Sequence, residues 1–201
     1  MGEKQAFQPL TREDKITVVL YRVGIVLSAV IMSGLAYLFV SAAPEAISSG
    51  SNRPADFLAY GLYGAVGLSV FFIHLYIRKF HVYLKNLFFV SLGCLAALLF
   101  IGEGSLSGGL GRVPSSTLLL LPLSGCLGFV TAKEAFCFKL FEGYLLAMIM
   151  PFYLLLVASG SLTSRGASYG LVLIAAMFVV FTLRKVFMPI AYDIGDKSAY
   201  R

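Results

Sequence analysis

Residues 16–41 read ITVVLYRVGIVLSAVIMSGLAYLFVS and contain a single charged side chain, Arg22. A helix needs about 20 apolar residues to cross a bilayer, so this run is long enough for a membrane span. Backbone amides cannot stay unpaired in lipid, and the run must therefore be helical. Glu13 and Asp14 lie just before it, which argues against a cleavable signal peptide.

Five more apolar runs predict spans at 56–77, 84–101, 115–131, 141–158 and 168–183. Of the 201 residues, 59% are hydrophobic and 13% charged, and the mean hydropathy is +0.87. Soluble domains are about 45–50% apolar and about 25% charged, so a soluble enzyme, a disordered chain and a disulfide scaffold are excluded. We predict an all-α, polytopic transmembrane helix bundle over residues 16–190, with tails at 1–15 and 191–201.

Basic residues are distributed unequally between the two ends of the predicted spans. Thirteen of them lie on the side of the two tails, and only Arg53, Arg112 and Arg165 lie on the other. Cytoplasmic loops carry the excess of Lys and Arg, so we predict that both termini are cytoplasmic. This pattern explains the net charge of +6 without nucleic acid as a partner.

Small residues recur in the second span, where Gly61, Gly64 and Gly67 are three residues apart. Such strips let helix backbones approach closely in lipid. They favour packing within this chain, and the alternative is an interface with another membrane protein or with a second copy. The glycine-rich segment 102–114 lacks the ending of a phosphate-binding loop, and we interpret it as a flexible connector.

Pro122 and Pro151 lie near the middle of the fourth and fifth spans, where proline bends a helix. We interpret them as two helix kinks. The alternative is a transport site, because several transporters bind their substrates where broken helices meet.

Charged side chains close to the predicted membrane region are few. We expect Arg22 and Glu142 to reach the headgroups or to pair with each other. His74 and His81 flank one span end and are interpreted as interfacial residues, because two haem-ligating rings would have to face one another. We find no catalytic motif, metal site or cofactor site, and Cys94, Cys126 and Cys137 show no CxxC spacing.

The most distinctive segment is TAKEAFCFKLFEGY at 131–144, in which Lys133, Glu134, Lys139 and Glu142 mix with aromatic residues. We expect it to lie along the membrane interface before turning into the bilayer. The stretch from Lys133 to Phe138, followed by Phe141-Glu142 and a proline-containing span, resembles an uncharacterised integral membrane family, number 2301 among the domains of unknown function. The resemblance implies coverage of nearly the whole chain, a cyanobacterial or plastid setting and no catalytic residues.

The sequence favours a non-enzymatic accessory or assembly factor that acts through helix–helix contacts with a membrane complex. The alternative is a small transporter or permease for a neutral or weakly polar solute, which requires a cavity that reaches the middle of the membrane. An intramembrane enzyme would need converging polar side chains that the sequence does not reveal. We expect the protein in a bacterial inner membrane or a thylakoid membrane, with the lipid bilayer as its first partner.

Overall fold

The computed structural model describes residues 11–41, 52–75, 78–190 and 193, and everything described is helix, turn or loop. The six predicted spans are confirmed as helices long and apolar enough to cross a membrane. The helices are α1 (Arg12–Ser41), α3 (Arg53–Phe72), α4 (Arg78–Ile101), α5 (Leu106–Arg112), the 3₁₀-helix η1 (Pro114–Leu120), α6 (Leu121–Phe138), α7 (Phe141–Ala158) and α8 (Ser164–Val186).

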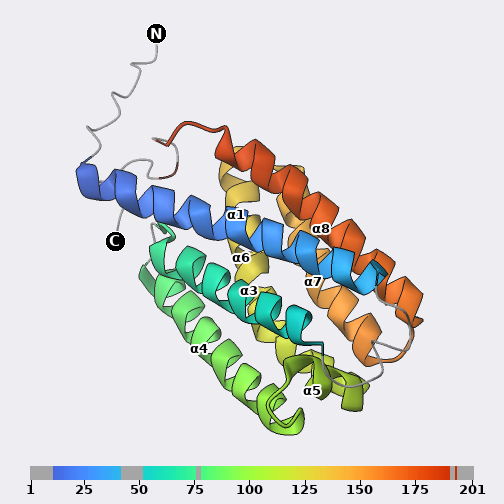
Figure 1. The fold of residues 1–201 in the computed structure, drawn as a ribbon. Coiled ribbons are helices and arrows are strands. Elements are labelled where there is room, and N and C mark those ends of the chain that lie inside the picture. Colours follow the sequence, from blue (N-terminus) through green and yellow to red (C-terminus); the bar gives the residue numbers. More distant parts are fainter. Residues whose placement is uncertain (1–10, 42–51, 76–77, 191–192, 194–201) are drawn as a thin grey trace.

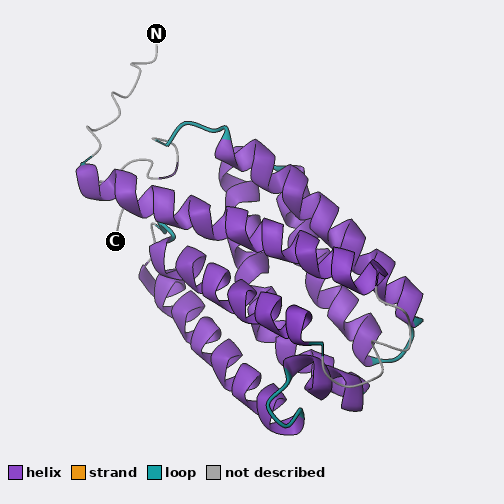
Figure 2. Cartoon of the chain, viewed as in Figure 1, coloured by secondary structure: helices purple, strands orange, loops and turns teal. Residues whose placement is uncertain are grey.

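The six spans form a ring of antiparallel neighbours (Figure 1). α1 packs between α3 and α8, α7 packs between α8 and α6, and α4 packs on α6. Contacts of α3 with both α4 and α6 close the ring. Figure 2 shows that helices account for nearly all of the described chain, with short connections at the two ends. Segments far apart in sequence therefore meet inside the bundle.

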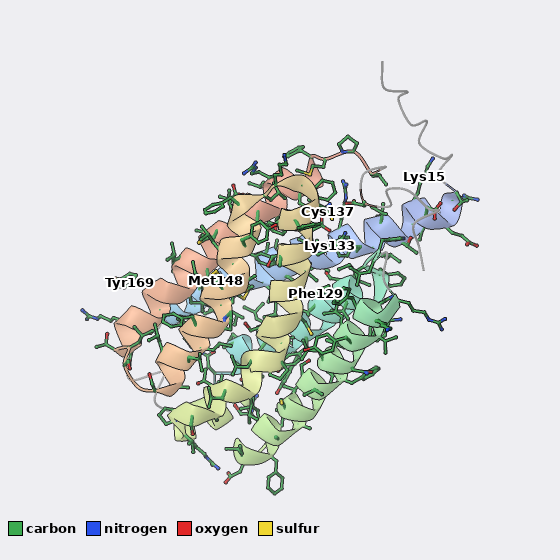
Figure 3. The ribbon with its side chains drawn as sticks, turned by 180° about the vertical axis from the view of Figure 1, so that it is seen from behind. Lys15, Phe129, Lys133, Cys137, Met148 and Tyr169 are labelled. Atoms are coloured by element: carbon green, nitrogen blue, oxygen red, sulfur yellow. The ribbon has the colours of Figure 1, made fainter. Side chains whose placement is uncertain are left out.

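The outer surface of the ring is apolar. Phe57, Phe100 and Met148 expose 78%, 90% and 72% of their surface, respectively, and Met148 and Tyr169 project from the face seen in Figure 3. Exposed aromatic and aliphatic side chains at this density are typical of a lipid-facing surface. The protein is an integral membrane protein, and the orientation of its termini stays a prediction.

The interpretation of the glycine-rich segment as a flexible connector is wrong, because most of it folds as α5. The Ser105 hydroxyl caps the helix by accepting a hydrogen bond from the Gly108 amide at 3.0 Å. Gly109 touches the end of α4, where an added Cβ would lie 2.5 Å from the Leu98 carbonyl oxygen. Only glycine permits this approach, so α5 packs tightly beneath the ring.

Two further expectations about the fourth span need correction. Pro122 does not interrupt an α-helix, because it lies in the first turn of α6, directly after η1. Pro151, in contrast, does lie inside α7. The segment from 131 to 138 does not run along the interface but continues α6 to Phe138. Its inward-facing Glu134 is fully buried, and its contacts hold this end of the helix in the bundle.

Candidate functional site

A partly open cavity of about 430 Å³ lies in the half of the bundle that contains α5. Its volume falls within the range of about 300–1,000 Å³ that is typical of small-molecule sites. Most of its wall is hydrocarbon; the apolar lining includes Met32, Leu35, Phe39, Leu62, Leu106, Leu110, Leu123, Leu127, Met150, Leu171 and Ile174. The cavity therefore suits a largely apolar guest.

Polar groups near α5 hold the structure together at this end. Asp56, buried in the first turn of α3, accepts hydrogen bonds of 2.7 Å from the Ser105 hydroxyl and from the Ser107 amide. The Asn52 side chain caps α3 by accepting a hydrogen bond from the Ala55 amide, and the backbone N–H of Asn52 donates to the Ser107 hydroxyl at 2.8 Å. These bonds tie the start of α3 to the start of α5.

Two residues deeper in the cavity wall carry hydroxyl groups that differ from these polar groups, because their oxygen atoms are enclosed and unpaired. Tyr63 and Ser124 line the cavity, are only 4% and 7% exposed, and have no hydrogen-bond partner in the described structure. Each unpaired buried polar group costs about 1–3 kcal/mol. Neither residue stands out in the sequence, because tyrosine and serine are common in apolar spans.

The other half of the bundle contains buried charges, which we call the charge cluster. Its members are Tyr21 and Arg22 of α1, Lys133 and Glu134 of α6, Lys185 of α8 and Asp193. A fully buried core layer that includes Ile25, Val130 and Phe178 separates it from the cavity. None of the cluster residues lines the cavity, so the two features occupy opposite halves.

Glu134 is the anionic centre of the cluster. Its Oε1 atom accepts hydrogen bonds of 2.7 Å from the Tyr21 hydroxyl and from Lys133 Nζ, and its Oε2 atom pairs with Lys185. Lys185 is completely buried and lies over the Phe138 ring, 3.8 Å from its centroid. Figure 3 shows Lys133 on α6, with Cys137 one turn further along the same helix.

Asp193 supplies the second carboxylate of the cluster. It forms one ion pair with Lys185 and a second with Arg22, whose Nη2 atom lies 2.6 Å from Asp193 Oδ2. Arg22 also donates to the carbonyl oxygens of Val186, Met188 and Pro189. The segment after α8 is therefore held against α1 at its charged end.

The charge cluster contains three basic side chains against two carboxylates. Buried ion pairs of this kind add little net stability over apolar packing, but removal of one partner is costly because the remaining charge cannot reach water. The cluster therefore fixes how α1, α6 and α8 fit together. Among the residues described, His, Cys, Asp and Glu do not gather in groups of three that could hold a metal ion.

The structure brings together only part of the predicted site. Arg22, Lys133 and Glu134 meet in the charge cluster, but Arg22 and Glu142 do not pair with each other, since Glu142 pairs with Arg184 of α8. Lys139 is exposed in the link between α6 and α7, at φ 55°.

The three glycines of α3 have three different environments. A Cβ at Gly67 would lie 2.7 Å from the Phe88 ring and one at Gly61 would lie 3.3 Å from Ile31, whereas one at Gly64 would meet nothing within 4 Å. Intramolecular packing thus explains Gly67 and leaves Gly64 on an open face. Gly93 of α4 is equally open.

His74 joins the loop after α3 to α1, through a 3.2 Å hydrogen bond between its ring and the Thr17 hydroxyl. Burial, and next the positive charge of Lys133, lower the pKa of His74 below its usual 6.5. The folded protein thus keeps this ring neutral at a pH where the unfolded chain takes up a proton.

We expect stability to fall as pH drops below about 6.5, because the unfolded state then binds the extra proton. The slope that His74 contributes reaches at most about 1.4 kcal/mol per pH unit and ends below its lowered pKa. Thermal unfolding of the full chain in mild detergent, from pH 8 to pH 5, measures it. H74Q cannot be protonated and should lose that slope; equal slopes in both proteins would contradict the assignment.

Sequence reasoning missed Tyr21, Lys185 and Asp193, as well as Tyr63 and Ser124. The signal for Lys185 was misleading, because a basic residue at the end of a span is expected to face the cytoplasm. Asp193 falls in the segment predicted to be a tail. No local pattern connects these residues, since Tyr21 meets Glu134 across 113 positions and Arg22 meets Asp193 across 171.

Comparison with known proteins agrees with this architecture. No curated protein and no solved structure matches the chain. A family described as uncharacterized integral membrane protein (DUF2301) matches residues 68–201. The match starts inside α3 and is thus shorter than the resemblance implied. It includes α4 to α8 and four residues of the charge cluster: Lys133, Glu134, Lys185 and Asp193. The chain belongs to the DUF2301 family of integral membrane proteins.

Proposed function

We propose that the protein is a non-enzymatic accessory protein of the membrane that holds a largely apolar ligand inside its helix bundle. One observation carries this proposal: the cavity of about 430 Å³, whose wall is mostly leucine, methionine, alanine and phenylalanine. The cavity is partly open to the surroundings of the bundle, which gives a ligand a way in. An accessory protein of this kind keeps or presents an apolar molecule to other components of the membrane.

The separation of the two halves supports this role. The charge cluster joins α1, α6 and α8 on one side of the core layer and leaves the cavity half free to accommodate a guest. Ligand sites in helix bundles commonly lie between helices whose packing elsewhere is rigid.

Filling the cavity should remove the ligand. Ala59 of α3 lines the cavity, and A59L places a larger side chain in it. We expect about tenfold less apolar compound to accompany A59L than the unchanged protein, since overpacking costs about 1–3 kcal/mol. The measurement is solvent extraction and mass spectrometry of protein purified from its own membranes in mild detergent.

G64L is the matched control on the same helix, because Gly64 faces open space. It should keep the compound at the level of the unchanged protein. Equal amounts of compound in A59L and in the unchanged protein, or an unchanged protein that carries none, would refute the proposal.

A second candidate is an assembly role through helix contacts, which the open positions at Gly64 and Gly93 favour. Small residues facing lipid allow another helix to pack closely. In the same purification, G64L would then lose a membrane protein that A59L retains.

The permease alternative is favoured by the depth of the cavity, which reaches Tyr63, Leu127 and Ile174 near the middle of their helices. It predicts that liposomes containing the protein swell faster in glycerol than protein-free liposomes, and that A59L removes the difference. The apolar wall makes binding a better match than passage of a polar solute.

A further inference from the structure

Tyr63 and Ser124 stand at the same level of the membrane. Tyr63 is ten residues after Arg53, the start of α3, which corresponds to about 15 Å along the helix. Ser124 follows the seven residues of η1 and the first turn of α6, or about 18 Å from the same end. Tyr63 and Ser124 therefore lie at a similar depth, on α3 and α6, which contact each other.

Other hydroxyls on the cavity wall do have hydrogen-bond partners within the protein. The Tyr153 hydroxyl donates to the Ala167 carbonyl at 2.9 Å, and the Ser168 hydroxyl donates to the Phe39 carbonyl at 3.1 Å. Both residues line the same cavity. Tyr63 and Ser124 are thus distinguished by chemistry as well as by position, because buried polar groups are normally paired.

The charge around the cavity restricts the guest. Among the described residues of the wall, Asp56 is the only charged one, and both of its oxygens already accept hydrogen bonds from the start of α5. An ion at the level of Tyr63 would be buried without a counter-charge, at a cost of several kcal/mol. The guest must therefore be uncharged at that depth.

We propose that the cavity binds an uncharged lipophilic molecule through one oxygen, a hydroxyl or a carbonyl, and that the enclosed hydroxyls of Tyr63 and Ser124 turn toward the cavity to donate hydrogen bonds to it. The hydrocarbon body of this molecule lies along Leu106 and Leu110 toward α5. This assignment rests on the proposed ligand-holding function and adds the chemical class and the orientation of the ligand.

The test uses a series of dodecyl compounds, each with a photoreactive diazirine at the end of its chain. The head groups are an alcohol, a methyl ketone, a methyl group, a carboxylate and a trimethylammonium. The full chain is reconstituted in liposomes and irradiated with each compound, and the modified peptides are identified by mass spectrometry. The alcohol and the ketone should label α5, because their oxygen is held at Tyr63 and Ser124.

Two substitutions remove only the hydroxyls. We expect Y63F and S124A each to weaken competition by unlabelled dodecanol about threefold to tenfold, with no change for dodecane. Y153F is the matched control, since the Tyr153 hydroxyl already has a partner, and it should leave both values unchanged. The circular dichroism of all three variants verifies that they are folded.

The outcomes separate the ligand class from the function. Labelling of cavity peptides that is equal for all head groups, or insensitive to Y63F and S124A, would overturn the hydrogen-bonded ligand while leaving the cavity function intact. Strongest labelling by the ammonium compound, abolished in D56N, would overturn the uncharged class. Absence of cavity labelling by every compound would refute the proposed function itself.

Discussion

Replacing Glu134 by glutamine is expected to lower the free energy of unfolding by about 3–5 kcal/mol, the usual cost of breaking a buried ion pair. Glutamine retains the size of the side chain but removes the charge that Lys133 and Lys185 share. Asp193 would then be the only carboxylate for three basic side chains. Reversible unfolding in mixed micelles of mild detergent and sodium dodecyl sulfate measures the loss.

Replacing Lys185 by methionine should be markedly milder. In K185M, Glu134 still pairs with Lys133 and Asp193 still pairs with Arg22, and methionine preserves contact with the Phe138 ring. The double variant E134Q/K185M should recover at least about 2 kcal/mol of the loss caused by E134Q. Additive effects, or a greater loss in K185M than in E134Q, would show that Glu134 is not the centre of the cluster.

Gly24→Ala is the second substitution with a large expected effect, a loss of about 1–3 kcal/mol. A Cβ at this position would lie 2.8 Å from both the Ala65 carbonyl oxygen and the Ser69 amide nitrogen of α3. Both are backbone atoms, so the clash can be relieved only by moving α1 and α3 apart. The same unfolding experiment measures this loss.

Gly64→Ala provides the comparison. Nothing lies within 4 Å of the new methyl group, and alanine is favoured over glycine in helices by about 1 kcal/mol. G64A should therefore match or exceed the stability of the unchanged protein. A loss of similar size in G24A and G64A would mean that helix propensity, and not the contact between α1 and α3, sets the effect.

Helix positions could be predicted from the sequence because the signal is local. An apolar run that must satisfy its own backbone in lipid has one available structure, and the fifth span, 141–158, coincides with α7. The glycines illustrate where local reasoning stops: the periodic strip in α3 was visible, but the crowded glycine at the α1–α3 contact is Gly24. What a residue faces depends on the neighbouring helix, which one sequence does not specify.

The candidate site was less predictable for the same reason. Lys133 and Glu134 were recognised because they interrupt an apolar chain, whereas Lys185 and Asp193 resembled ordinary residues at the end of a span. The glycine-rich segment before η1 was misinterpreted because glycine is common both in loops and at close backbone contacts. Here, the contact of Gly109 with the end of α4 decides between the two.

The pairing of Arg22 with Asp193 also constrains the order of events during membrane insertion. Arg22 emerges from the ribosome 171 residues before the carboxylate that neutralises it. Through the insertion of every later helix, this guanidinium must stay hydrated at the membrane surface, because an unpaired charge is costly in lipid. The first helix therefore settles to its final depth only after the last one has been delivered. If synthesis stops before Asp193, the Arg22 side chain stays unpaired and is exposed to the membrane quality-control machinery.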